Sequence, residues 1–594
     1  MRRRKKKSRR MVRAGLLLLI LLLSGCADRG REEKSEQSVH TEASTETRKG
    51  EVVEKEVLKD HVSEDKTIYA RDAEDSVVTM YLTVRSGNEE DHTNHSWTEV
   101  NAHSAYYYED NQLARYNCEA ILQVGDENGP VEGEFGYGET VPNAAVQIRG
   151  QTSSELEQKN YKIRIKKGKG EWRGQRTLAL NKHVFDPFRF TNKLCYDLIK
   201  EVPQMIGART QFVHLYVKDE TEGGNGQFTD YGLYTQVEQM NKTFLKNHGL
   251  DSKGYLYKVN FFEWYRYEDV LKEKDDPDYD EKTFEEYLEI KGRDDHEKLL
   301  TLLDTVNDYS IPIGEIVEQY FEVDNLCYWA AFHILTGNHD VGSRNFYLYS
   351  PLNSEKWYIL SWDNDSSFMK TFNRRINYSE GDSWERGITQ FTHIVLFNRM
   401  FKEEKYRRKL DDAVNDLRKN YLTDEKISSK AHRYASVVKP YLFRQPDEAY
   451  SRADAGMYDE LVEAMVPELQ GNVQNYRDSL EKPWPFYVGT PYEEGGQMLV
   501  DWDAAYDIDG ESITYSFTLA GDYDFRDVIL HKKGIRIPGI SFDTLPPGEY
   551  FIRVRAKNTS GYEQDCYDYY ATDQGKIYGA FRFIVQEDGS IVVG

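Results

Sequence analysis

The chain has 594 residues, with 101 acidic and 77 basic side chains and a formal net charge of −24 at pH 7. So acidic a chain repels nucleic acid and anionic lipid headgroups, which argues against nucleic acid as a partner. Its five cysteines form no Cys-x-x-Cys pair, which argues against a zinc site or a dense disulfide framework. The length predicts several domains.

The N-terminal residues have the pattern of an export signal. Nine Lys or Arg residues precede Gly15, residues 16–23 are all Leu or Ile, and Ser24-Gly25-Cys26 follows. A basic head and a short apolar run are typical of a secretory signal, and this run is too short for a lasting transmembrane helix. The sequence at 23–26 resembles a bacterial lipobox, which implies cleavage before Cys26 and its diacylation; the alternative is cleavage without lipidation.

This pattern predicts the first two parts of the chain. Residues 1–25 are expected to be a lipoprotein signal peptide, and removing their nine cations takes the charge from −24 to about −33. Residues 26–66 are rich in Glu, Lys, Ser and Thr and are expected to form a flexible charged tether. We therefore expect a bacterial cell-membrane protein, lipid-anchored on the extracytoplasmic face.

The next part of the chain predicts a strand-rich region. In residues 159–165, Tyr161, Ile163 and Ile165 alternate with Lys162 and Arg164, which predicts a strand with one buried face. A helix is expected after Pro187. Other strands are expected at 77–82, 120–124, 145–148, 212–217, 231–237 and 255–259.

A helix followed by a hairpin is predicted between residues 324 and 361. Asp324 can cap the helix and Gly337 can end it, so Asp340 is expected in the loop that follows. The runs 346–349 and 357–360 predict a β-hairpin. If Tyr349 lies opposite Trp357, Asn345 falls near Ser361 and Asp363 lies beside the 340–345 loop.

The C-terminal part changes composition. Residues 390–480 are expected to be mainly helical, and the chain is β-rich from about residue 487. The Pro-Pro-Gly-Glu-Tyr sequence that ends at Tyr550, together with Trp502, resembles a fibronectin type III module. Residues 487–594 contain none of Asp340, Asn345, Asp363 and Asp365, which we call the acidic set, so we expect them to fold alone and to be dispensable for nucleotide turnover.

The acidic residues after the helix have the spacing that phosphoryl transfer requires. Such a site needs one carboxylate for the proton of the attacking hydroxyl, and acidic or amide oxygens for the metal ion at the phosphates. An Asp, an Asn five residues later and a second Asp beyond a hairpin are ordered as in protein kinases. Asp340, Asn345 and Asp363 fit this order, although each residue alone is also an ordinary turn residue.

Five segments together resemble the CotH-type spore-coat protein kinases. They are Arg149-Gly150-Gln151-Thr152-Ser153, Lys159-Asn160-Tyr161, Gly232 to Glu238, Gly337 to Tyr347 and Trp362-Asp363-Asn364-Asp365-Ser366-Ser367-Phe368. The resemblance covers about residues 75–480. It implies an α+β fold, in which a two-lobed, atypical protein-kinase-like domain at 67–483 precedes an all-β, fibronectin type III or immunoglobulin-like sandwich at 487–594.

The resemblance also implies a function and a role for each site residue. The expected function is transfer of phosphate from ATP, with Mg or Mn, to Ser or Thr of a protein on the cell surface or coat. Asp340 is implied as catalytic base, with Asn345 also catalytic; Asn345, Asp363 and Asp365 are implied as metal ligands. Lys159 is implied to hold the phosphates and to pair with Glu238, with Lys162 as the alternative because neighbouring strand positions face opposite sides.

Two other functions remain open from the sequence. ATP is scarce outside the cytoplasm, so one alternative is a catalytically silent lipoprotein that binds cell-wall sugar or protein. The acidic set favours an enzyme, because a binding module does not need Asp340, Asn345, Asp363 and Asp365 together. The second alternative is a kinase-fold enzyme that transfers AMP, because fold does not determine which group is transferred.

Overall fold

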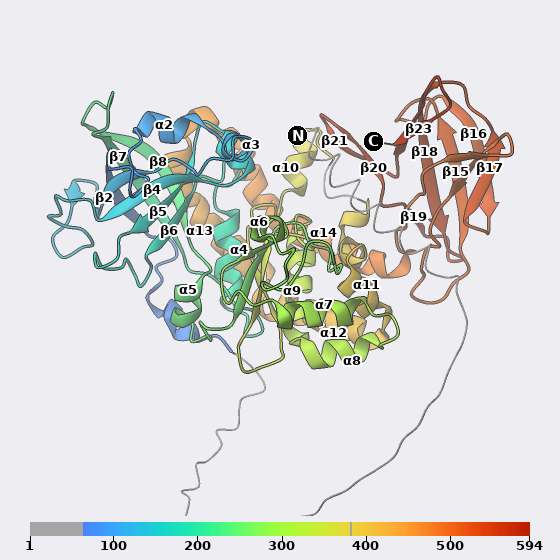
Figure 1. The fold of residues 1–594 in the computed structure, drawn as a ribbon, viewed down its shortest axis with the longest axis horizontal. Coiled ribbons are helices and arrows are strands. Elements are labelled where there is room, and N and C mark those ends of the chain that lie inside the picture. Colours follow the sequence, from blue (N-terminus) through green and yellow to red (C-terminus); the bar gives the residue numbers. More distant parts are fainter. Residues whose placement is uncertain (1–62, 380–382, 594) are drawn as a thin grey trace, which may run out of the picture.

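The computed structural model describes residues 63–379 and 383–593. The fold is mixed α/β, with several sheets, and its described part contains three hydrophobic clusters. In Figure 1 a strand-rich region at one end is followed by a helical middle and a second β region at the other end. Residues 1–62, including Cys26, the predicted signal and most of the predicted tether, lie outside the described residues.

The first region is a closed barrel with an extra strand. Strand β1 pairs in parallel with β7 and antiparallel with β2, which closes a ring of seven strands in the order β1-β7-β8-β6-β5-β4-β2. The predicted alternation is observed in β5, where Tyr161, Ile163 and Ile165 are buried in the barrel core and Lys162 faces outward. The barrel strands are β1 Val77–Arg85, β2 Cys118–Asp126, β3 Gly129–Pro130, β4 Ala144–Arg149, β5 Asn160–Ile165, β6 Thr177–Asn181, β7 Thr210–Asp219 and β8 Phe228–Glu238.

The middle region is built on a small antiparallel sheet covered by helices. Its strand order is β10-β9-β11-β12, with β9 Tyr255–Val259, β10 Leu288–Ile290, β11 Phe346–Ser350 and β12 Tyr358–Ser361. Helix α9, Val323–Thr336, is buried along most of its length, and Gly337 ends it in the left-handed conformation, as predicted. The largest hydrophobic cluster joins this sheet to its helices.

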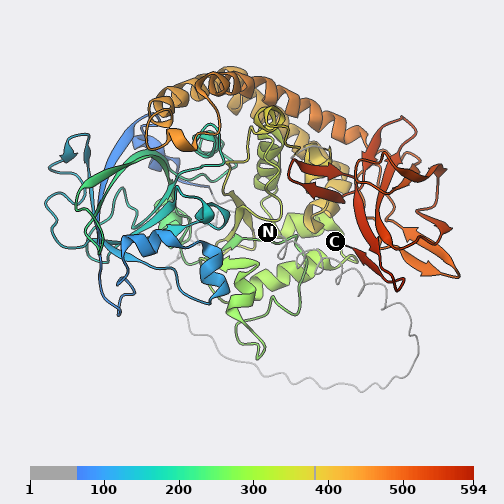
Figure 2. The same cartoon turned by 90° about the horizontal axis from the view of Figure 1, so that it is seen from above.

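The α-helices of the described residues have the following bounds. They are α2 Trp97–Ala102, α3 Ala105–Asp110, α4 Thr191–Ile199, α5 Lys242–Asn247, α6 Glu281–Glu285, α7 Glu297–Asn307, α8 Ile313–Tyr320, α9 Val323–Thr336, α10 Lys370–Arg375, α11 Val395–Lys402, α12 Glu404–Asp416, α13 Asp424–Leu442 and α14 Ala455–Glu481. The long helix α14 runs from the middle region toward the C-terminal β region (Figure 2). None of the described helices combines the length and the apolar character needed to cross a membrane.

The C-terminal region consists mainly of two antiparallel sheets around one core. The sheets have the orders β13-β14-β17 and β16-β15-β18-β22-β23, and a separate hairpin joins β20 to β21. The bounds are β13 Tyr492–Glu494, β14 Gln497–Asp501, β15 Thr514–Ala520, β16 Val528–Ile535, β17 Gly539–Asp543, β18 Gly548–Lys557, β19 Glu563–Asp565, β20 Tyr569–Thr572, β21 Gly575–Tyr578, β22 Phe581–Val585 and β23 Ile591–Val593. The Tyr550 hydroxyl donates to the carbonyl oxygen of Pro546 at 2.9 Å, which fixes the turn before β18.

Candidate active site

The loop that carries Asp340 follows directly from the buried helix α9. A Cβ atom on Gly337 would lie 2.7 Å from the Asn472 amide nitrogen of α14, so the helix end has room only for glycine. The Asn338 side chain then accepts a hydrogen bond from the Asp340 backbone N–H at 3.1 Å. Asp340 therefore lies on a loop that two rigid helices support.

The hairpin β11–β12 brings Asn345 and Asp363 together. Phe346 pairs with Ser361, and the Trp362 N–H donates to the Asn345 carbonyl at 3.0 Å. The register differs by one residue from the prediction, because Tyr349 pairs with Tyr358 rather than with Trp357. Asn345 and Asp363 thus leave the two ends of the hairpin side by side.

Both residues have left-handed backbone conformations. The φ angle is +60° at Asn345 and +56° at Asp363, a conformation that is uncommon for residues other than glycine. Such conformations cost free energy and persist where the surrounding structure imposes them, often at functional sites.

Asp340 and Asn345 are in direct contact. The Asn345 amide donates to the backbone carbonyl of Asp340 at 2.8 Å and to its carboxylate oxygen Oδ2 at 2.9 Å. Arg344 forms an ion pair with the other carboxylate oxygen. The Asp340 side chain remains 32% exposed, so its carboxylate is held in place while it stays accessible to a substrate.

Asp363 lies in a crowded acidic environment. Burial raises its pKa to about 7, and the charges of Asp365 and Asp340 act in the same direction, against His183 and Arg149. A cation bound near Asp363 would offset the repulsion that it feels from the two other carboxylates.

Asp365 is oriented from the opposite side by residues of the barrel-to-helix connection. The Nδ1 atom of His183 lies 3.4 Å from Oδ2 of Asp365. Asn192, in the first turn of α4, lies 3.4 Å from the other ring nitrogen of His183 and accepts a hydrogen bond from the Asn364 N–H at 3.1 Å. The sequence analysis did not identify His183; its only signal was a position just before the predicted helix.

The donor atoms present fit a magnesium or manganese ion that also binds phosphate. Asn345, Asp363 and Asp365 supply oxygen atoms, which are the ligands that these ions prefer. The Asn364 side chain between the two aspartates is fully buried, and neither its oxygen nor its nitrogen has a hydrogen-bond partner. Among the described residues, no three His, Cys, Asp or Glu side chains are arranged to hold a metal.

A cationic wall is defined here as Lys162 and the four cations whose charges act on it, Arg115, Arg149, Arg164 and Lys291; of these, Arg149 also interacts with Asp363. The β4–β5 register places Gln147 opposite Lys162, so Arg149 and Lys162 share the outer face of the barrel. Burial lowers the pKa of Lys162 to about 8, and the four other cations of the wall act in the same direction. Lys162 therefore faces other cations.

Arg149 connects this wall to the carboxylates. Its guanidinium donates to the Asn181 side chain at the end of β6, and the charge of Asp363 opposes the pKa decrease that burial causes at Arg149. Within the described residues, neither Arg149 nor Lys162 forms an ion pair with a carboxylate. Half-buried cations without an ion-pair partner are costly, so this arrangement suits an anionic ligand. The Arg-Gly motif was the sequence signal for Arg149, but the sequence analysis assigned it no role.

Lys159 belongs neither to the acidic set nor to the cationic wall. Its ammonium donates to the Ser154 carbonyl at 2.7 Å, and the carboxylates that act on its pKa are Glu155 and Glu157 of its own loop. Of the two candidate lysines, Lys162 rather than Lys159 shares the face of Arg149, because Lys159 precedes β5 and bonds back to its loop.

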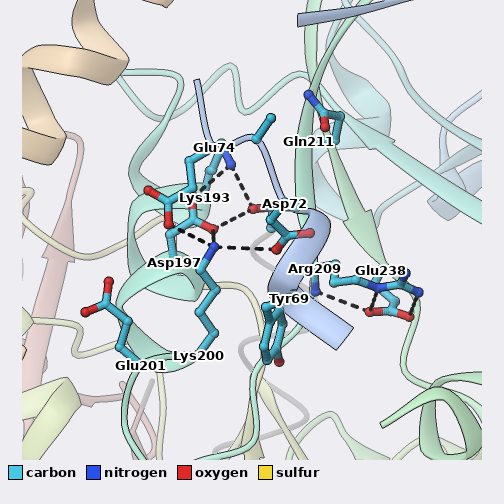
Figure 3. Close-up of polar contacts among 12 residues, drawn as sticks. Tyr69, Asp72, Glu74, Lys193, Asp197, Lys200, Glu201, Arg209, Gln211 and Glu238 are labelled. Atoms are coloured by element: carbon cyan, nitrogen blue, oxygen red, sulfur yellow. Dashed lines mark hydrogen bonds and ion pairs between the residues drawn. The ribbon is translucent and has the colours of Figure 1, made fainter. Parts of the chain in front are cut away.

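The prediction that Glu238 pairs with Lys159 is wrong. Glu238 binds Arg209, with Nε at 2.9 Å and Nη2 at 2.5 Å (Figure 3). Its carboxylate also lies 2.9 Å from Nε2 of His248. Burial opposes its ionisation, but the hydrogen bonds from Arg209 and His248 outweigh this and lower the pKa of Glu238 to about 2. The physical reason is strand register: Glu238 lies across β6 from Ile163 of β5, whereas Lys159 precedes β5 and bonds to the Ser154 carbonyl of its own loop.

The Gly232 motif has a structural role. Gly232 has a φ of +74°, and a Cβ atom there would lie 2.2 Å from the Asp447 carboxylate. Asp447 pairs with the buried Lys182 and accepts from the Leu233 N–H at 2.9 Å. This glycine therefore lets a residue beyond α13 bind the barrel.

The chain was compared with known proteins. The family described as CotH kinase protein matches residues 146–482, more than half of the chain. Inner spore coat protein H of Bacillus subtilis (strain 168) is 22% identical over 346 residues, covering 56% of this chain and 86% of that protein.

Two solved structures were also found, both with low structural similarity. The HipA, HipB and operator DNA complex of Shewanella oneidensis MR-1 aligns at 13% identity with a TM-score of 0.20, over 51% of this chain and 60% of that chain. The twitchin kinase region of C. elegans aligns at 11% identity with a TM-score of 0.16, over 69% of this chain and 71% of that chain. These TM-scores carry no argument about the fold.

The family match includes most of the residues described above. It extends from β4 through α14 and therefore includes Arg149, Lys162, His183 and the acidic set. The chain belongs to the CotH kinase protein family.

Proposed function

We propose that this protein transfers the γ-phosphate of ATP, with Mg or Mn, to Ser or Thr of a protein on the cell surface or coat. The observation that carries the proposal is the interaction of Asp363 with Arg149, which shares a barrel face with Lys162, while neither cation forms an ion pair within the described residues. The negative charge of Asp363 acts on the Arg149 guanidinium, and Arg149 shares the outer barrel face with Lys162. Carboxylates that suit a metal, beside cations that suit phosphate, match a nucleotide polyphosphate.

Each group has a distinct task in this proposal. Asp340 accepts the proton of the attacking hydroxyl, and the Asn345 amide orients the Asp340 carboxylate. Asp363, Asp365 and Asn345 hold the metal, and His183 orients Asp365. Arg149 and Lys162 bind the phosphates. A bound metal ion supplies charge neutralisation at the transferring phosphoryl group.

The proposed arrangement has two lobes and an added domain. The barrel would serve as the upper lobe and the helical region as the lower lobe of a kinase-like domain at 67–483. Residues 487–594 would form a fibronectin type III-like sandwich, supported by the Tyr550 hydrogen bond to Pro546 and by the buried Trp502.

The proposed location is the extracytoplasmic face of a bacterial membrane, through a lipid on Cys26. The similarity to a protein named as a spore coat protein supports a coat or surface protein as substrate. Detergent-phase partition of the wild type and of Cys26→Ser tests the anchor, because partition that is unchanged by the substitution would contradict it.

Labelled ATP tests the proposed reaction. The full chain is incubated with Mg or Mn, a generic acceptor protein and ATP labelled at either the γ- or the α-phosphate. Phosphoryl transfer predicts label in the acceptor only from γ-labelled ATP, and Asp363→Asn should remove it. Label from α-labelled ATP would indicate AMP transfer, and no label with a folded protein would favour a silent binding protein.

A further inference from the structure

The hairpin β20–β21 extends from the C-terminal sandwich and contacts the helical region. Figure 2 shows this red hairpin beside the yellow helices. The Ser379 N–H donates to the Gln574 carbonyl and the Lys576 N–H donates to the Ser379 carbonyl, both at 2.9 Å. Gly575 has a φ of +103°, and a Cβ atom there would lie 2.7 Å from Ser379 backbone atoms. The contact is therefore made backbone to backbone.

Side chains of the C-terminal region then hold residues 383–394, which we call the underlying segment. Lys576 forms an ion pair with Glu385, and the Tyr578 hydroxyl donates to the other carboxylate oxygen of Glu385 at 2.5 Å. The Tyr567 hydroxyl donates to the Thr392 hydroxyl at 2.7 Å, and both groups are buried.

The underlying segment packs directly against the loop that carries the acidic set. Gly342 has a φ of +95°, and a Cβ atom there would lie 2.6 Å from Cδ1 of Ile394 and 3.9 Å from Cδ1 of Phe391. Gly342 lies between Asp340 and Asn345 in the chain. Ile394 is two residues from Thr392, so the hydrogen bond from Tyr567 restrains the segment that packs against this loop.

Glu385 forms a second, electrostatic connection between the C-terminal hairpin and the same loop. Burial works against the ionisation of Glu385, but His339 and Lys576 lower its pKa. His339 is adjacent to Asp340 in the chain. Glu385 therefore links the hairpin to the residue that precedes the proposed base.

We propose that the C-terminal domain positions the catalytic loop, with Tyr567, Tyr578 and Lys576 as positioning residues that act through the underlying segment on Asp340. The inference rests on the proposed function for its effect on turnover. It reverses the sequence-based expectation that residues 487–594 are dispensable. A shift of about 1 Å in a reacting group can cost ~10²-fold in rate, so a support of this kind controls turnover.

The test compares two variants of the full chain, each with a matched control. Tyr567→Phe and Tyr578→Phe, combined, remove only two hydroxyl groups from the contact. Tyr550→Phe is the matched control, since it removes one hydroxyl that bonds within the sandwich, to Pro546. Lys576→Met removes the ion pair, and Lys557→Met is its control because Lys557 pairs with Glu563 inside the same domain.

Two measurements separate the inference from the proposed function. Hydrogen exchange of residues 338–345 reports the support of the loop without any need for activity. For the double Tyr variant and for Lys576→Met we expect faster exchange there, a kcat lower by about 10- to 100-fold and an unchanged affinity for ATP. The Tyr550→Phe and Lys557→Met controls should leave all three quantities unchanged, and Lys576→Arg should recover most of the kcat.

Three outcomes would overturn the inference. The first is unchanged exchange in residues 338–345 when exchange in residues 567–578 shows that the contact is broken. The second is equal exchange in the controls and the test variants, which would indicate general destabilisation. The third is an equal loss of ATP affinity and kcat. A wild type that binds ATP but transfers nothing would contradict the proposed function, while the exchange measurement would still decide the inference.

Discussion

The two sides of the proposed site are encoded in very different ways. The acidic side, Asp340, Asn345, Asp363 and Asp365, comes from one stretch of 26 residues and is assembled by a single hairpin. The cationic wall comes from β4, β5 and two loops, and its members lie between residues 115 and 291. Local spacing therefore revealed the acidic side, whereas only the paired strands reveal that Arg149 and Lys162 share a barrel face.

The acidic side and the cationic wall would also have different functions in phosphoryl transfer. The acidic side would hold the metal and accept the proton, so its loss should affect the chemical step most. The cationic wall would hold the phosphates, so its loss should affect nucleotide binding more than chemistry. The predictions below run from the largest expected effect to the smallest.

Asp363→Ala should have the largest effect. Without the main metal carboxylate, turnover should fall by roughly 10⁴-fold or more, because a metal ion supplies several kcal/mol of transition-state stabilisation. The thermal shift that ATP gives with Mg or Mn should also disappear. A variant that keeps this shift would show that the metal is held elsewhere.

Asp340→Asn should lower turnover by about 10²- to 10⁴-fold, which is the usual contribution of a general base. This corresponds to roughly 3–5 kcal/mol of transition-state stabilisation. Nucleotide binding should be spared, because Asp340 is proposed to act only on the attacking hydroxyl. Steady-state kinetics and the ATP thermal shift measure the two effects, and full phosphoryl transfer by the folded variant would contradict the assignment.

Arg149→Met and Lys162→Met should each weaken ATP binding by about 10- to 100-fold, the range for hydrogen bonds to charged groups. Adenosine binding should change little, so titration calorimetry with ATP, ADP, AMP and adenosine should show a reduced preference for phosphates. Lys159→Met is the matched control, since Lys159 bonds to the Ser154 carbonyl in its own loop. A larger effect at Lys159 than at Lys162 would contradict the assignment of the cationic wall.

The smallest effect concerns stability and pH. The pKa of Asp363 rises from 3.8 to about 7 on folding, so the folded state binds more protons than the unfolded state between these values. In the absence of metal, Asp363 should therefore reduce stability as the pH rises from about 4 to 7. Asp363→Asn should match the wild type near pH 4 and exceed it near pH 8 in denaturant midpoint. An equal difference at both pH values would contradict this origin.

Several structural elements could be predicted because their signals are local. The β5 alternation placed Tyr161, Ile163 and Ile165 in the core, and Gly337 marked the end of α9. The hairpin at 346–361 was identified to within one residue of its register. In each case neighbouring residues carry the signal, either through side-chain period or through backbone freedom.

Other features depended on contacts between distant segments. Closure of the barrel requires β1 to pair with both β2 and β7, and the parallel β1–β7 pairing has no local signature. The face of Glu238 follows from its register with β6, and its partner His248 lies beyond the strand. His183 and the contact of Tyr567 with Thr392 likewise join segments that are far apart in the chain.

The sequence by itself determined the family resemblance, most of the barrel strands and the order of Asp340, Asn345 and Asp363. Those features depend on side-chain period, turn residues and spacing over short distances, which a single chain displays directly. Tertiary structure alone decided that Arg149 interacts with Asp363 and shares a barrel face with Lys162, that Glu238 binds Arg209, and that the C-terminal hairpin contacts the underlying segment. Strand register and domain packing set these contacts through the burial of surfaces far apart in the sequence, which no local pattern records.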